Sequence, residues 1–258
     1  MILAVDIGNS NIVLGCLNEK QIFFVSRIST DHKKASDQYA VEIGSILSLY
    51  NTNIRDITGA IISSVVPPLS NAISAAVQLL IGIVPLQVGP DIKTGLNILI
   101  DNPKQTGSDL VVAAVAAISE YKKPIIIIDM GTATTISVID SNADFLGGAI
   151  IPGLQISLEA LKGRTAQLPG ISLEAPKQVI GKNTIDCMQS GIVFGTCAMI
   201  DGMIDRIANE IGENPTVVAT GGLAPVIIGY CSHAIYYDAN LMLKGLYIIY
   251  KMNNNSFE

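Results

Sequence analysis

The chain has 258 residues, enough to bury a sizeable core in one large domain or in two smaller ones. Its formal net charge is −6 and it contains no basic run, so nucleic acid is not an expected partner. Hydrophobic residues make up 49% of the chain, but glycines, prolines, serines and charges interrupt the apolar stretches before the roughly 18 to 20 residues that a membrane span needs. We therefore expect no membrane partner either.

The N-terminal residues also argue against export. MILAVDIG has no basic segment of the kind that opens a signal peptide, and it reaches Asp6 early, so it reads as a first strand of a cytoplasmic protein. The four cysteines include no Cys-x-x-Cys pair and there are only two histidines, so we expect reduced thiols and no zinc site.

The first residues predict a strand, an Asp-x-Gly turn and a returning strand. Ile2 to Val5 lead into Asp6, and Gly8 and short polar side chains precede a second strand from Ile12 to Leu17. A carboxylate at a strand end, a glycine that permits close approach of the backbone, and free N–H groups suit a phosphate chain and its metal. For a single copy, an ordinary hairpin with Asp and Gly as turn formers is the alternative.

The pattern that follows predicts strand, helix, strand, helix, strand and then a further helix. The expected elements are a strand at Gln21 to Ile28, a helix capped by Ser36, a strand at Gly59 to Val66, a helix from about Leu69 to Leu80, a strand at Val84 to Val88 and a helix from about Leu110 to Tyr121. Just before that last helix, Asp109 is well placed to serve as an N-cap or as a first-turn acid that offsets the helix dipole.

The strand-turn-strand plan is then written a second time. Ile125 to Asp129 is an apolar strand, and Gly131 and a run of threonines precede the strand Thr134 to Ile139. Two copies favour two domains, which we place at residues 1–120 and 121–258. The remaining expected elements are a strand at Phe145 to Ile150, a helix through Leu161, a helix from Thr184 as its cap to about Gly212, a strand at Thr216 to Thr220 that enters Gly221-Gly222, a strand at Ile235 to Tyr237, a helix at Leu241 to Tyr250 and a frayed tail from Asn253 to Glu258.

Duplicated units of this kind resemble those of the actin, sugar-kinase and heat-shock-chaperone superfamily. Within it, the chain is identified as a member of the type III pantothenate kinase family by motifs along its whole length. These are DIGNSNIVLG (6–15), SSVVPPL (63–69), DNPKQTGSD (101–109), DMGTATT (129–135), LGGAIIPGLQISLEAL (146–161), TAQLP (165–169), IGKNT (180–184), MQSG (188–191) and ATGGLA (219–224). The resemblance implies an α/β fold of two similar actin-like (ribonuclease H-like) domains, each a mixed sheet flanked by helices, with the nucleotide cleft between them.

The same resemblance implies an enzyme that phosphorylates pantothenate to 4'-phosphopantothenate with ATP, the first step of coenzyme A biosynthesis. It implies Mg²⁺, a monovalent cation (K⁺ or NH₄⁺) and a homodimer with the substrate site near the subunit interface. Asp109 would be the general base, Asp6 would hold Mg²⁺ through water and Asp129 would bind the monovalent cation. ATP would contact Asp6, Ile7, Gly8, Asn9, Ser10, Asn11, Ile12, Val13 and Thr132, and pantothenate would contact Ile100, Gly107, Ser108, Asp109, Leu110 and Thr184.

Two positions depart from the family pattern. Leu110 stands where an arginine is usual, and Ile100 stands where a tyrosine is usual. One interpretation is an active kinase in which Lys104, Lys162 or Arg164 supplies the missing positive charge. The alternatives are a catalytically silent or regulatory paralogue that binds nucleotide, and a kinase for another small alcohol.

Overall fold

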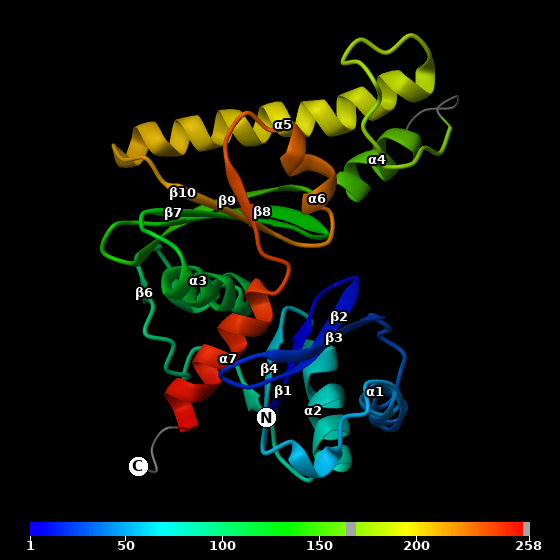
Figure 1. Ribbon diagram of the computed structural model, residues 1–258, viewed down its shortest axis with the longest axis vertical. Helices are drawn as coiled ribbons and strands as arrows, with labels where there is room; N and C mark the ends of the chain where they lie inside the picture. Colours follow the sequence, from blue (N-terminus) through cyan, green and yellow to red (C-terminus); the bar gives the residue numbers. More distant parts are fainter. Residues whose placement is uncertain (164–168, 255–258) are drawn as a thin grey trace. The chain divides into compact units, whose positions relative to one another are not determined.

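The computed structural model describes residues 1–163 and 169–254 (Figure 1). Arg164, residues 165–168 of the TAQLP motif and residues 255–258 of the expected frayed tail lie outside this described part. The chain groups into two compact units, one made of residues 1–96, 102–116 and the chain from Asn240 onward, and the other of residues 97–101 and 117–239. This grouping differs from a single boundary after residue 120, because the C-terminal helix packs in the core of the first unit.

The first unit is built on a mixed sheet with strand order β3-β2-β1-β4-β5. Its strands are β1 (Ile2–Ile7), β2 (Asn11–Leu17), β3 (Ile22–Ser29), β4 (Gly59–Ser64) and β5 (Leu86–Gln87). Its helices are α1 (Ser36–Leu49), α2 (Pro67–Ile81), α3 (Ser108–Glu120), which begins in this unit, and α7 (Leu241–Asn254), with short 3₁₀ turns at Ile54–Asp56 and Pro103–Gln105. The central strand β1 pairs antiparallel with β2 and parallel with β4.

Alternation along β1 explains how both faces of this sheet are covered. Leu3, Val5 and Ile7 belong to the core cluster that contains residues of α1 and α2. Ile2 and Ala4 belong to the opposite cluster, with residues of α3 and α7. Since successive side chains of a strand point to opposite faces, Asp6 lies on the face that α3 and α7 cover.

The second unit repeats this plan, with strand order β11-β10-β7-β8-β9-β6. Its strands are β6 (Asn97–Ile98), β7 (Ile125–Met130), β8 (Ala133–Ile139), β9 (Asp144–Pro152), β10 (Thr216–Thr220) and β11 (Ile235–Tyr237). Its helices are α4 (Leu154–Gly163), α5 (Thr184–Ile211) and α6 (Ala224–Ile227), followed by a 3₁₀ turn at Ile228–Tyr230. The strands β7 to β11, without β6, follow the order of β1 to β5, so the predicted internal duplication is confirmed.

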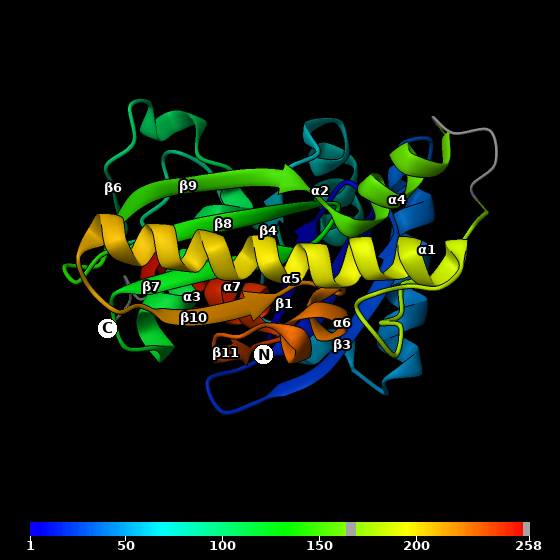
Figure 2. The same ribbon diagram turned by 90° about the horizontal axis from the view of Figure 1, so that it is seen from above.

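The long helix α5 runs across one face of the second sheet (Figures 1 and 2). By length and composition alone it could cross a membrane. However, Val193, Cys197, Ile200 and Ile204 are buried in a cluster that also contains residues of β7, β8 and β10. These contacts indicate the core helix of a globular unit.

Several predicted boundaries were wrong. Ala35, rather than Ser36, is the N-cap of α1, and the backbone N–H of Ala35 donates a hydrogen bond to the Gln38 side chain (2.9 Å). Asn183, rather than Thr184, caps α5, because its side chain accepts from the N–H of Asp186 (2.9 Å). The strand β5 is shorter than expected, β6 was not expected, and α7 continues to Asn254.

Candidate functional site

The first Asp-x-Gly turn presents backbone and polar groups rather than its apolar side chains. Ile7 and Ile12 are fully buried, so only their backbone can contact a ligand. Asn9, Ser10 and Asn11 are exposed, and the Gly8 N–H donates to the Asn11 carbonyl (2.9 Å), which closes the turn. Asp6 at the end of β1 and Val13 in β2 are half-buried neighbours in the pairing register. The turn therefore offers N–H groups and one carboxylate, the groups that suit a phosphate chain and its metal.

The segment Gly107 to Leu110 begins helix α3, and serine hydroxyls attach it to the end of β4. The Ser108 hydroxyl donates to the Ser64 carbonyl (2.9 Å) and accepts from the Ser64 N–H (3.2 Å). The buried Ser63 hydroxyl donates to the same Ser108 oxygen (3.1 Å). These bonds fix the first turn of α3 against the carboxyl end of the sheet.

The same attachment places Asp6 and Asp109 at one edge of the first sheet. Asp6 and Ser63 are register partners on neighbouring parallel strands, so their side chains point to the same face. Ser63 contacts Ser108, whose neighbour in the chain is Asp109. Two carboxylates predicted from distant motifs thus belong to one local arrangement within the first unit.

Asp109 has the electrostatics of a carboxyl group that holds a proton more readily than usual. Burial raises the pKa of Asp109 above 3.8, although a hydrogen bond from the Leu110 N–H (2.9 Å) favours the charged form. A buried carboxylate loses hydration, which raises its affinity for a proton. Such a shift favours a role as general base, because the best pKa for a general base lies near the pH at which the enzyme works.

The second turn gathers oxygen atoms around Asp129 at the end of β7. Thr135 in β8 and Thr220 in β10 are register partners of Asp129, so all three side chains share one face of the second sheet. Gly221 has φ of +90°, and a Cβ built there would lie 2.6 Å from Asp129 Oδ1. Only glycine lets the backbone pass so close to this carboxylate.

Thr132 is exposed in this second turn, whose Gly131 N–H donates to the Ala133 carbonyl (3.1 Å). Gly153, just after β9, lies against the other side of the turn. A Cβ on Gly153 would lie 2.8 Å from the Gly131 carbonyl oxygen and closer still to that of Thr132. The backbone of Gly153 therefore packs directly against the backbone of this turn.

The other two predicted substrate residues of the second unit belong to other parts of the chain. Thr184 is the exposed first residue of α5 and lines a mostly apolar hollow of about 250 Å³, together with Leu161, Cys187, Met188, Gly191 and Ile192. Ile100 follows β6, and its Cγ2 atom lies 3.4 Å from where a Cβ on Gly147 would stand. The structure thus brings Asp129 and Thr132 into one turn but places Thr184 and Ile100 on separate elements.

The donor set fits the metals that the sequence implies. Among residues 1–163 and 169–254, no group of three or more His, Cys, Asp or Glu could hold a metal ion by itself. Magnesium in kinases is usually held by one or two carboxylates together with substrate phosphates and water, which matches Asp6 beside the first turn. Hard oxygen ligands such as Asp129 and its threonine neighbours suit an alkali cation.

Sequence reasoning missed three residues that shape these turns, Ser63, Thr30 and Gly153. Ser63 gave only a weak signal, since it is one of two serines that end an otherwise apolar strand, and its complete burial is visible only in the structure. Thr30 donates from its hydroxyl to the Gly8 carbonyl (2.7 Å), a contact between residues 22 positions apart that local patterns do not indicate. Gly153 lies within a recognised motif, but the sequence does not indicate that it contacts the carbonyls of Gly131 and Thr132.

Comparison with known proteins gives consistent results. The family model for type III pantothenate kinase matches residues 2–206. A type III pantothenate kinase from Exiguobacterium sp. is 45% identical over 253 residues, which cover 98% of this chain and 99% of that protein.

Among solved structures, a Campylobacter jejuni protein described as a Baf family transcriptional activator has a TM-score of 0.60 at 22% identity and covers 98% of this chain and 100% of its own. Component A of (R)-2-hydroxyglutaryl-CoA dehydratase from Acidaminococcus fermentans has a TM-score of 0.56 at 16% identity, with 96% of each chain covered. These two structures show likeness of fold alone, and that fold is the expected actin-like one with two mixed sheets flanked by helices.

Proposed function

Because this chain belongs to the type III pantothenate kinase family, it is an enzyme that phosphorylates pantothenate with ATP in the first step of coenzyme A biosynthesis, and we propose that Asp109 is its general base. The observation that carries the proposal is the placement of Asp109. It is half-buried, its pKa is raised by burial, and serine hydroxyls attach its helix to the sheet edge where Asp6 and the first turn lie.

In this proposal Asp109 accepts the proton of the primary hydroxyl of pantothenate. The hydroxyl oxygen then forms a bond to the γ-phosphorus of ATP, the bond to the β,γ-bridging oxygen breaks, and ADP leaves. Phosphoryl transfer of this kind depends on positioning and on charge stabilisation more than on covalent chemistry by the protein. Positioned proton transfer contributes roughly 10²- to 10⁴-fold in rate.

We assign the phosphate chain of ATP to the turn from Asp6 to Val13, where the N–H groups would donate to phosphate oxygens. Asp6 would orient Mg²⁺ through a bound water molecule. When bound, Mg²⁺ would neutralise the charge that develops on the phosphate oxygens. We also assign an ATP contact to the exposed Thr132 and the monovalent cation to Asp129.

Leu110 and Ile100 leave the carboxylate of pantothenate without the usual arginine and tyrosine. We propose that Lys104 supplies the positive charge, because it lies in the 3₁₀ turn Pro103–Gln105 of the same segment as Asp109 and is exposed. Lys162 is exposed in the last turn of α4, in the second unit, and Arg164 lies outside the described residues. Lys104→Gln should raise the KM for pantothenate, while Lys20→Gln at an exposed hairpin should leave it unchanged.

We also propose a homodimer in the cytoplasm. Exposed apolar side chains near the start of α5 support an interface there, namely Val179, Ile180, Ile185 and Leu161. Thr184 lies among them, so it would contact pantothenate close to that interface. Sedimentation of the native protein and of an Ile180→Asp variant would test this, and a native monomer would contradict it.

The direct test is formation of phosphopantothenate and ADP with Mg²⁺ and K⁺ while pantothenate is titrated, together with a panel of other small alcohols. Asp109→Asn should lower kcat by about 10²- to 10⁴-fold. Asp91→Asn, at an exposed site in the same unit, is the matched control and should keep the native rate. Turnover of Asp109→Asn at the native rate would contradict the assignment of the base, and a much better alcohol than pantothenate would change the substrate.

A further inference from the structure

We propose that Thr30 is a positioning residue that orients the peptide groups of the first turn toward the phosphates of ATP. This inference rests on the phosphate-binding role proposed above for that turn. Thr30 follows β3 and makes two hydrogen bonds to the turn. Its hydroxyl donates to the Gly8 carbonyl (2.7 Å), and its N–H donates to the Ser10 carbonyl (3.0 Å).

These two bonds determine which way the neighbouring N–H groups face. In a trans peptide group the C=O and N–H point in opposite directions. Because the carbonyls of Gly8 and Ser10 point toward Thr30, the N–H groups of Asn9 and Asn11 point away from it. Both of these residues are exposed. Thr30 therefore turns two nearby N–H donors of the turn away from itself, and donors of this kind can bind an anion.

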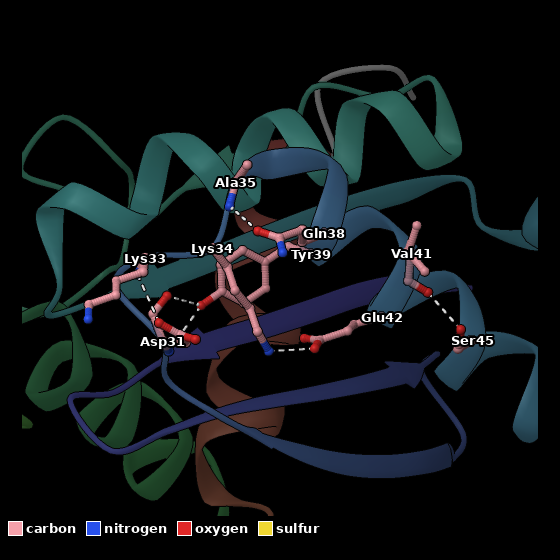
Figure 3. A network of polar contacts seen from close by, with 9 residues as sticks. All are labelled: Asp31, Lys33, Lys34, Ala35, Gln38, Tyr39, Val41, Glu42 and Ser45. Atoms are coloured by element: carbon pink, nitrogen blue, oxygen red, sulfur yellow. Dashed lines mark hydrogen bonds and ion pairs between the residues drawn. The ribbon is translucent and has the colours of Figure 1, made fainter.

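Thr30 is itself held in place by a buried tyrosine. The Tyr39 hydroxyl in α1 donates to the carbonyl of Asp31 (2.8 Å) and accepts from the N–H of Asp31 (3.2 Å) (Figure 3). Tyr39 thus holds the backbone of the residue that follows Thr30. Tyr39 is fully buried. The Lys34 ammonium lies 5.6 Å from the centre of its ring and pairs with Glu42 (2.5 Å). This network restrains the backbone next to Thr30 without touching the turn.

The test is Thr30→Val, which removes the hydroxyl and keeps the shape of the side chain. The KM for ATP should rise about 5- to 30-fold, because one hydrogen bond is lost and the Gly8 carbonyl is freed to rotate. The KM for pantothenate and the pH profile should stay unchanged. Titration of the protein with ADP alone, followed by calorimetry, should show the same loss of affinity. Thr30→Ser keeps a hydroxyl and should restore binding.

Thr58→Val is the matched control, because the Thr58 hydroxyl donates to the Met1 carbonyl (3.3 Å) at the opposite end of β1. If Thr30→Val lowers Tm as Thr58→Val does but binds ADP with native affinity, the hydroxyl only stabilises the fold and the proposal is wrong. If Thr30→Val does not fold, Tyr39→Phe decides the matter, since it should weaken ADP binding and native affinity would overturn the proposal. ADP titration requires no turnover, so failure of the pantothenate assignment would be seen separately, in the native protein.

Discussion

The two Asp-x-Gly turns occupy the same position in two sheets of equivalent strand order, but different means hold them. Thr30 follows β3 and donates hydrogen bonds to two carbonyls of the first turn. Gly153 follows the equivalent strand β9 and approaches two carbonyls of the second turn so closely that no Cβ could fit. One turn is oriented by a hydroxyl group, and the other is packed against bare backbone.

This difference separates two ways of preorganising a site. A hydrogen bond can be weakened step by step through side-chain changes, whereas a steric contact with backbone tolerates almost no change. The two sheets also carry different residues beside the strand-end aspartates, Ser63 next to Asp6 and Thr220 next to Asp129. Ser63 connects its turn to the helix of Asp109, so the proposed base belongs to the first unit.

Apart from removal of the proposed base, the largest expected effect comes from adding a positive charge to the first turn of α3 in the first unit. Leu110→Arg should lower the KM for pantothenate about 10- to 100-fold, because a charged hydrogen bond to a carboxylate contributes roughly 1.5 to 3 kcal/mol. Steady-state kinetics with pantothenate as the varied substrate measure it. If Lys104 already supplies the positive charge, Leu110→Arg should lower the KM for pantothenate by a larger factor in the Lys104→Gln variant than in the native protein. An unchanged KM in both backgrounds would mean that residue 110 does not contact the substrate.

Gly153→Ala should break the second turn. The added methyl group would overlap the Thr132 carbonyl, so we expect about 1 to 3 kcal/mol of destabilisation and a weaker response of the rate to K⁺. Gly202→Ala in α5 is the control, since its Cβ meets nothing within 4 Å and alanine favours helix. Denaturant unfolding measures the free energy of unfolding of both variants. If Gly153→Ala were as stable as Gly202→Ala, packing against Gly153 would not hold the second turn.

Ser63→Ala should loosen the first turn of α3 without changing its charge. We expect a loss of about 0.5 to 1.5 kcal/mol in stability and a lower kcat, because Asp109 would be less well positioned. Ser45→Ala, at an exposed hydroxyl in α1, should change neither quantity. Lost stability with native kcat would show that Ser63 serves the fold alone.

The smallest effect concerns stability and pH. Burial raises the pKa of Asp109 in the folded protein, so the charged carboxylate opposes folding, and this cost develops as the pH rises from the unfolded pKa through the folded one. Asp109→Asn should therefore raise Tm slightly at pH 7, and the difference should vanish well below pH 4, where both states of the native chain are protonated. A lower Tm at pH 7 would contradict this sign.

Much of the fold could be predicted because its signals are local. The apolar strands that end in Asp6 and Asp129 and the helices after Pro67 and Asn183 are set by neighbours in sequence, and the repetition of the turn indicated two similar units. The edge strand β6 escaped prediction because Asn97 and Ile98 form too short a run to show a period. Ser36 and Thr184 were mistaken for caps because the residues before them, Ala35 and Asn183, take that place.

The site was only partly predictable, for a physical reason. Its carboxylates and threonines lie in recognisable motifs, but their support comes from residues distant in sequence. Ser63 and Ser108 are 45 positions apart, and Tyr39 reaches Thr30 only through the backbone of Asp31. The raised pKa of Asp109 likewise depends on burial that only the folded chain creates.

The most direct test of the account is the pH dependence of kcat for phosphopantothenate formation, measured for the native chain and for Asp109→Asn. The account predicts that native kcat falls as pH drops through an apparent pKa above the usual aspartate range, and that the variant keeps a low, nearly pH-independent rate. If the variant retained the native rate and the same pH dependence, Asp109 would not be the base.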